Sequence, residues 1–131
     1  MSTRVSERMG FQYVVLRCVP RVDREEFVNV GVVLYCQAVG FLEARCHVDR
    51  DRLAALDTEV DVDAVCSALE AVEAVCRGDE SAGAAGRTNL GTRFGFVKAP
   101  RSTVVQPGPV HGGTTDDPAG QLAHLLESLV R

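Results

Sequence analysis

Six polar residues in two stretches of the chain have side chains that could bind an anion. They are Arg17, Asn29, Arg45, Arg101, Ser102 and Thr103. Guanidinium groups bind phosphate or carboxylate through paired hydrogen bonds, and amides and hydroxyls can complete such a site. The sequence therefore predicts a ligand-binding site made of an Arg/Asn cluster and the segment around Arg101.

Each candidate also has a purely structural explanation. Arg17 can form an ion pair with Glu43 across neighbouring strands. Arg101 can form a salt bridge with Glu26 or with the acidic stretch between residues 57 and 80, and Asn29 can satisfy irregular backbone. Arg17 and Asn29 interrupt otherwise aromatic or aliphatic rows, which favours partial burial with a defined partner. The structural and the ligand-binding explanations both stay open at this stage.

Metal-binding and catalytic patterns are weak. The chain has five cysteines, and none of them forms a CxxC pair. Cys18, Cys36 and Cys46 are expected on one apolar face, but their spacing matches no zinc signature and His47 points to the other face. No nucleophile elbow or phosphate-loop motif is present. We therefore predict no catalytic residue, no metal and no cofactor, and reduced, buried thiols.

Three consecutive strands must position the Arg/Asn cluster. Alternating residues predict strands within 11–19, 27–36 and 41–48, joined by short links, as in an antiparallel meander. The most apolar row lies in the second strand and is expected to face the core: Val28, Val30, Val32, Leu34 and Cys36.

Two main helices are expected to cover this sheet. Apolar residues at helical spacing predict one helix over 61–77 and another in the leucine-rich C-terminal stretch that follows Asp117 and Pro118. Short strands within 94–97 and 103–106 would bring the sheet to four or five strands. We expect an α+β fold in which both helices pack on the apolar face of an antiparallel sheet.

A length of 131 residues favours a single domain. Residues 1–9 are polar and predict a flexible tail before a domain over 10–131. Residues 79–93 are rich in Gly, Ala and Ser without periodicity, which predicts a flexible loop.

The composition is typical of a cytoplasmic globular protein. Hydrophobic residues make up 46% and charged residues 24%, and the net charge is −4. Nothing in this balance indicates nucleic-acid binding, and no apolar run resembles a secretory signal or a membrane span. An uncovered sheet edge or apolar face would favour a homodimer.

Three motifs carry a family resemblance: R-x-V-P at 17–20, Glu26 followed by Asn29 and Gly31, and R-S-T-x-x-Q at 101–106. The chain resembles the bacterial domain of unknown function 3037 family from Gly10 to Val130. The resemblance implies no activity. Members of that family resemble small proteins that are often encoded beside HipA-like kinases, so a HipA-like kinase is an implied partner.

We therefore expect a non-catalytic binding or regulatory module that acts through a protein partner. The alternative is a phosphate-handling enzyme or an anion-binding protein that uses Arg17, Asn29, Arg45 and Arg101. An enzyme should gather these side chains in one concave pocket, whereas a binding module should present them on an open surface or a sheet edge.

Overall fold

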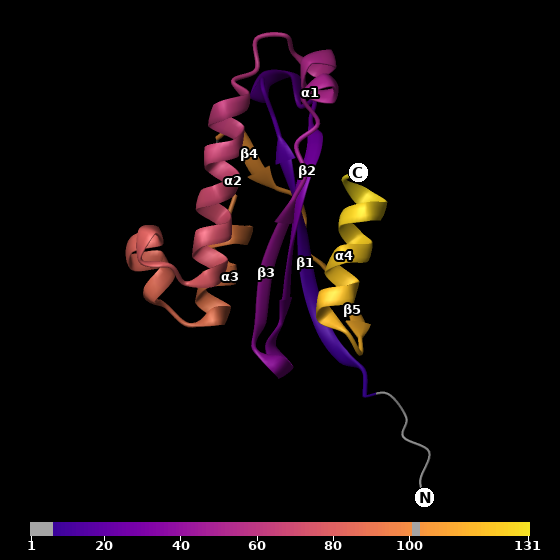
Figure 1. The fold of residues 1–131 in the computed structure, drawn as a ribbon, viewed down its shortest axis with the longest axis vertical. Coiled ribbons are helices and arrows are strands. Elements are labelled where there is room, and N and C mark those ends of the chain that lie inside the picture. The colour runs from indigo at the N-terminus through magenta and orange to yellow at the C-terminus, as the bar shows by residue number, and fades with distance from the viewer. Residues whose placement is uncertain (1–6, 101–102) are drawn as a thin grey trace, which may run out of the picture.

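A computed structural model describes residues 7–100 and 103–131 of the chain. The sheet lies between two helical layers, with α2 (Val62–Arg77) on one side and α4 (Pro118–Leu129) on the other (Figure 1). The fold is mixed α+β, as predicted, and its sheet is antiparallel throughout.

The sheet has five strands, in the order β3-β2-β1-β4, with β5 also paired to β1. The strands are β1 (Met9–Cys18), β2 (Val28–Cys36), β3 (Phe41–Cys46), β4 (Val105–Pro107) and β5 (His111–Thr115). β1 to β3 form the predicted meander. β4 pairs with the C-terminal end of the long strand β1, and β5 pairs with its N-terminal half.

Short 3-10 turns connect the meander strands. They are η1 (Val22–Arg24) and η2 (Gln37–Val39). Both turns end in the left-handed region, at Glu25 and at Gly40, where glycine is the residue with the least steric cost.

The helices begin at polar capping residues. Besides α2 and α4, the chain forms α1 (Arg50–Leu56), η3 (Glu80–Arg87) and α3 (Leu90–Lys98). The side chains of four capping residues each accept a hydrogen bond from a backbone N–H in the first turn: Asp49, Asp61, Asn89 and Asp117. Such caps satisfy donors that the helix itself leaves free.

The sheet has a hydrophobic core on each face. The larger core joins the sheet to α1, α2 and α3, and the smaller one joins it to α4. The expectation that both main helices cover one face was therefore wrong. The sheet needs two covers because β2 carries buried aliphatic residues on both of its faces, such as Val33 toward α2 and Val32 toward α4.

A β-bulge in β2 explains why residues expected in one row lie on different faces of the sheet. Leu16 pairs with Gly31 and Arg17 pairs with Asn29, so Val30 is the extra residue. Val30 consequently packs in the α2-side core, together with Val33, whereas the following alternate residues of the expected row pack under α4. The assignment of Val28 to Cys36 to a single apolar row was wrong because one inserted residue reverses strand alternation.

The segment after α2 differs from the expected loop and strand. Residues 79–93 contain the 3-10 turns of η3 and the start of α3, and 94–97 lies within α3 rather than in a strand. Leu90, Phe94 and Val97 occur at helical spacing, and Phe94 packs on the ring of Tyr35, with ring centroids 5.1 Å apart. This apolar face of α3 packs against the sheet.

The flexible tail was expected over residues 1–9. Residues 1–6 of it lie outside the described residues, and β1 already begins at Met9. Within the described residues, no helix has the length and hydrophobicity needed to cross a membrane.

Candidate functional site

Arg17 and Asn29 lie side by side on the α4 face of the sheet. They are opposite each other in the β1–β2 register, just beyond the bulge. Leu16 and Cys18, which flank Arg17 in sequence, point into the α2-side core, so strand alternation directs Arg17 to the other face. We call this pair and its surroundings the Arg17–Asn29 surface.

The Arg17 guanidinium is held between an aromatic ring and a glycine. Its Cζ lies 4.1 Å from the centroid of the Phe27 ring, a distance at which a cation and an aromatic face attract each other. Just after the end of β4, a Cβ added to Gly108 would lie 3.0 Å from both Cζ and Nε of Arg17. The backbone N–H of Gly108 donates to Val15 O at 2.8 Å. The guanidinium therefore occupies a preformed slot.

Asn29 fixes the C-terminal end of α4. Its Nδ2 donates to Leu129 O at 3.0 Å, and Arg52 Nη1 donates to Val130 O at 2.6 Å. Carbonyls at the end of a helix lack partners within the helix, and a cation near them is favourable. The amide nitrogen of Asn29 therefore has a structural role, and this bond determines where its oxygen points.

A donor and an acceptor remain unpaired on the Arg17–Asn29 surface. Arg17 Nε and Asn29 Oδ1 are both buried, and neither has a hydrogen-bond partner among the described residues. An unmade hydrogen bond at a buried polar atom costs about 1–3 kcal/mol. Both residues are only partly buried as a whole, so other atoms of Arg17 and Asn29 reach the surface.

Of the other predicted residues, the two that the structure describes, Arg45 and Thr103, do not join this pair in one pocket. Arg45 is exposed on β3, and its Nε lies 3.4 Å from Glu43 Oε1. Thr103 donates through Oγ1 to Val105 O at 2.6 Å, so its hydroxyl proton is used within its own strand segment. Arg101 and Ser102 lie outside the described residues.

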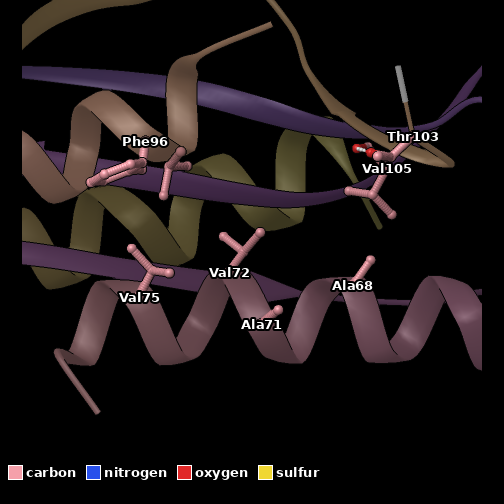
Figure 2. A pocket seen from close by; sticks show the side chains of 8 residues that line it. Ala68, Ala71, Val72, Val75, Phe96, Thr103 and Val105 are labelled. Atoms are coloured by element: carbon pink, nitrogen blue, oxygen red, sulfur yellow. Dashed lines mark hydrogen bonds between the residues drawn. The ribbon is translucent and has the colours of Figure 1, made fainter. Parts of the chain in front are cut away.

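Thr103 instead borders an apolar pocket on the α2 face. The pocket has a volume of about 240 Å³ and is lined by residues of α2, α3 and β4: Ala68, Ala71, Val72, Val75, Phe96, Val97, Thr103 and Val105. Figure 2 shows aliphatic side chains of α2 pointing toward Phe96 and Val105 across this space. The sheet separates Thr103 from Arg17 and Asn29, so these residues cannot bind the same small ligand.

The cysteines do not converge on a shared site. Cys18 and Cys46 pack on the α2 face, whereas Cys36 packs under α4, so the expected common face was wrong for the same reason as the valine row. Burial raises the pKa of Cys46 from 9.0 to about 12, with a further contribution from Glu73. Burial likewise raises the pKa of Cys76 to about 12. These thiols stay protonated, and therefore weakly nucleophilic, at neutral pH.

Comparison with known proteins identifies one family. The family model described as a protein of unknown function (DUF3037) matches residues 13–130, which is nearly the whole described chain. The chain belongs to the DUF3037 family. No curated protein and no solved structure matches it.

Sequence reasoning missed three contributors to the Arg17–Asn29 surface of this DUF3037 chain. Phe27 supplies the ring over Arg17, Gly108 supplies the space for the guanidinium, and Arg52 helps to hold α4 against Asn29. A signal existed for Phe27, because alternation places it in the same row as Asn29. Gly108 stands between two prolines, which indicated only a break in the chain. No local sequence pattern connected Arg52 with the C-terminal end of α4, which lies more than seventy residues later in the chain.

Proposed function

We propose that this DUF3037 chain is a non-catalytic binding module of the bacterial cytoplasm, and that the Arg17–Asn29 surface contacts a protein partner. The observation that carries the proposal is the unpaired donor, Arg17 Nε, beside the unpaired acceptor, Asn29 Oδ1. A peptide or side-chain amide group has one acceptor and one donor and can pair with both. The family resemblance makes a HipA-like kinase the first partner to test.

The surroundings of this pair support a protein contact. The side chains of Phe27 and Leu129, which adjoin Arg17 and Asn29, are 43% and 38% exposed. Aromatic residues and arginine with a well-packed apolar neighbourhood are the residue types that contribute most to protein–protein binding. An open surface with a polar centre and an apolar rim fits a macromolecule better than a small metabolite.

A second candidate is an anion-binding or phosphate-handling protein that uses Arg17. A guanidinium in a fixed orientation suits a carboxylate or phosphate. Such an anion would leave Asn29 Oδ1 without a donor unless it also carried a proton, as a monoprotonated phosphate does. For this reason we place the protein contact first.

The experiment compares variants that differ at one arginine. Full-length wild type, Arg17→Met and Arg21→Met are immobilised, used to capture a purified HipA-like kinase and native-extract proteins, and then titrated with each identified partner. Arg17→Met removes the donors but keeps an apolar stem of similar reach. Arg21→Met is the matched control, because Arg21 is exposed and pairs only with Asp23 among the described residues.

We expect Arg17→Met to weaken partner binding by about thirtyfold or more, the effect of losing a central contact residue, and Arg21→Met to leave it unchanged. Equal affinity of wild type and Arg17→Met would contradict the proposal. Parallel titration with inorganic phosphate separates the two candidates, because Arg17-dependent phosphate binding without a protein partner would support the second. Arg101→Ala in the same titrations tests whether the segment with Ser102 and Thr103 takes part.

A further inference from the structure

The outer edge of β3 is an open edge of the sheet. β3 is the last strand in the strand order, and no described segment pairs with its outer side. In Figure 1, β3 runs between α2 and α4 with no other element drawn over it. An open edge strand is a template for pairing with another strand.

The backbone groups on this edge belong to alternate residues. His47 N donates to Val30 O at 2.9 Å, so the backbone groups of odd-numbered residues of this segment point toward β2. Leu42, Ala44 and Cys46 consequently direct their N–H and C=O groups outward. These three residues provide donors and acceptors for an added antiparallel strand.

We propose that a second copy of this chain supplies the added strand. In the proposed homodimer, two β3 strands pair antiparallel about a two-fold axis at Ala44, and the two sheets become one continuous sheet. Ala44 then exchanges hydrogen bonds with Ala44 of the second copy, and Leu42 does so with Cys46 of the second copy. All outward backbone groups of β3 find partners in this register.

Charge complementarity selects this register. With the axis at Ala44, Glu43 of each copy lies directly opposite Arg45 of the other, in the closely spaced pairs that do not share hydrogen bonds. A shift of two residues in either direction places Glu43 opposite itself or Arg45 opposite itself, and like charges directly opposite are unfavourable. The strand is therefore complementary to its own antiparallel copy in one register.

Glu43 and Arg45 are available for these contacts. Their only ion pair among the described residues is the one they make with each other, at 3.4 Å, and their side chains are 43% and 45% exposed. Exposed pairs of this kind contribute little to the stability of a monomer. Pairing across the axis would combine the four charges into one network.

The space beside β3 accommodates a second copy. A groove of about 310 Å³ runs along the edge, lined by Leu42, Glu43 and Ala44 of β3 and by Glu73, Cys76 and Arg77 of α2. The two-fold axis brings the α2 helices of the two copies together in antiparallel orientation across this groove. Glu73 of one copy then faces Arg77 of the other copy across the groove, which adds a second complementary pair of charges.

The β4 part of the opposite edge of the sheet is less suited to such pairing. Pro107 ends β4, and Pro109 separates β4 from β5. Proline cannot donate a backbone hydrogen bond and is common on edges that must not pair. This contrast favours β3 as the edge at which copies meet.

The test uses sedimentation of the full chain at several concentrations, with wild type and three charge variants. Glu43→Arg places two arginines opposite each other across the axis, and Arg45→Glu does the same with two glutamates. We expect wild type to dimerise and each single variant to raise the dimer Kd by about tenfold or more, since two attractive cross-strand pairs become repulsive. The double variant Glu43→Arg/Arg45→Glu should recover the wild-type Kd.

Mixing the two single variants gives the sharpest outcome. In a mixed dimer, Glu43→Arg places its arginines opposite the glutamates of Arg45→Glu, so the mixture should dimerise more tightly than either variant alone. Matched melting temperatures show that the variants are folded. A wild type that stays monomeric at all concentrations, single variants that dimerise like wild type, or a mixture that does not associate would each overturn the proposal.

Discussion

The two faces of the sheet are built differently. On the α2 face, three helices and the sheet enclose a continuous aliphatic and aromatic core. On the α4 face, one helix covers β2 and part of β3, and the row that contains Arg17 and Asn29 lies at the border of the smaller core. The larger core therefore lies on the first face, whereas two of the three buried unsatisfied polar atoms of the described residues lie on the second.

The difference indicates which face of the sheet is suited to a binding site. A buried donor or acceptor without a partner lowers stability, and folds tolerate such groups where a ligand or partner uses them. The α2 face also contains an unpaired nitrogen, Arg93 Nε. However, the same guanidinium donates to Cys76 O at 2.9 Å and so helps to end α2, which gives it a structural role.

The largest expected effect comes from a charge placed in the α2-side core. Val33 is fully buried there, and Val33→Asp would bury a carboxylate that has no cationic partner nearby in the described structure. We expect this variant not to fold, because burying an unpaired charge costs an amount of free energy comparable to or greater than the total stability of a domain, about 5–15 kcal/mol. Circular dichroism and solubility measure this, with Val33→Ala as the control that stays folded.

A folded, soluble Val33→Asp protein with the melting temperature of wild type would contradict the burial of Val33 in the α2-side core.

Two phenylalanines compare the faces directly. Phe94, on the α2 face, is 1% exposed, whereas Phe27, beside Arg17, is 43% exposed. We expect Phe94→Ala to lower the free energy of unfolding by about 3–5 kcal/mol, the usual cost of a cavity in a packed core. Phe27→Ala should cost less than about 1 kcal/mol, because it removes mainly a cation–π contact. Urea denaturation of both variants measures the difference, and equal losses would show that the α4 face is as tightly packed as the α2 face.

The buried thiols make the α2 face sensitive to alkaline pH. The pKa of Cys46 and that of Cys76 are each raised from 9.0 to about 12 in the folded chain, whereas thiols in the unfolded chain ionise near the ordinary value. Above pH 9 the unfolded state therefore loses protons that the folded state keeps, and stability falls as pH rises toward 12. Each thiol contributes a slope of about 1.4 kcal/mol per pH unit in this window.

Unfolding measured from neutral to alkaline pH tests this slope, with Cys46→Ala as the comparison. The variant should lose less stability per pH unit than wild type. Identical slopes would show that the Cys46 thiol ionises equally in both states.

The smallest effect on stability is expected at Gly108, on the α4 face. A Cβ at this position comes within 3.0 Å of the Arg17 guanidinium, which sits at the end of a flexible side chain and can shift. Gly108→Ala should change the free energy of unfolding by less than about 1 kcal/mol. It should nevertheless weaken partner binding, because the guanidinium leaves its slot. Wild-type affinity in this variant would show that the position of Arg17 within the slot does not matter.

Local patterns predicted most of the framework. Strand alternation located β1, β2 and β3, and helical spacing with polar caps located α2 and α4, because both signals depend on neighbouring residues. Strand alternation also placed Arg17 and Asn29 in facing rows, and the register makes them direct partners.

The rest depended on contacts between distant residues. Neither the bulge at Val30 nor the assignment of α4 to the second face can be predicted from local spacing, because both depend on how β1 and α4 dock onto β2. The slot around Arg17 requires Gly108, which is brought close only when β4 pairs with β1. α3 was missed because its glycines hid the helical spacing of Leu90, Phe94 and Val97.

The bulge also affects how the family's sequences should be aligned. In β2, residues before Val30 and residues after Gly31 follow opposite parity, so the strand consists of two short repeats out of phase by one residue. An alignment that treats the nine residues of β2 as one alternating unit would assign the residues on one side of the bulge to the wrong face. A relative that lacks the residue equivalent to Val30 would lose one buried side chain of the α2-side core but would keep every other residue of the strand on its face. A one-residue gap elsewhere in the strand would instead move residues to the wrong face.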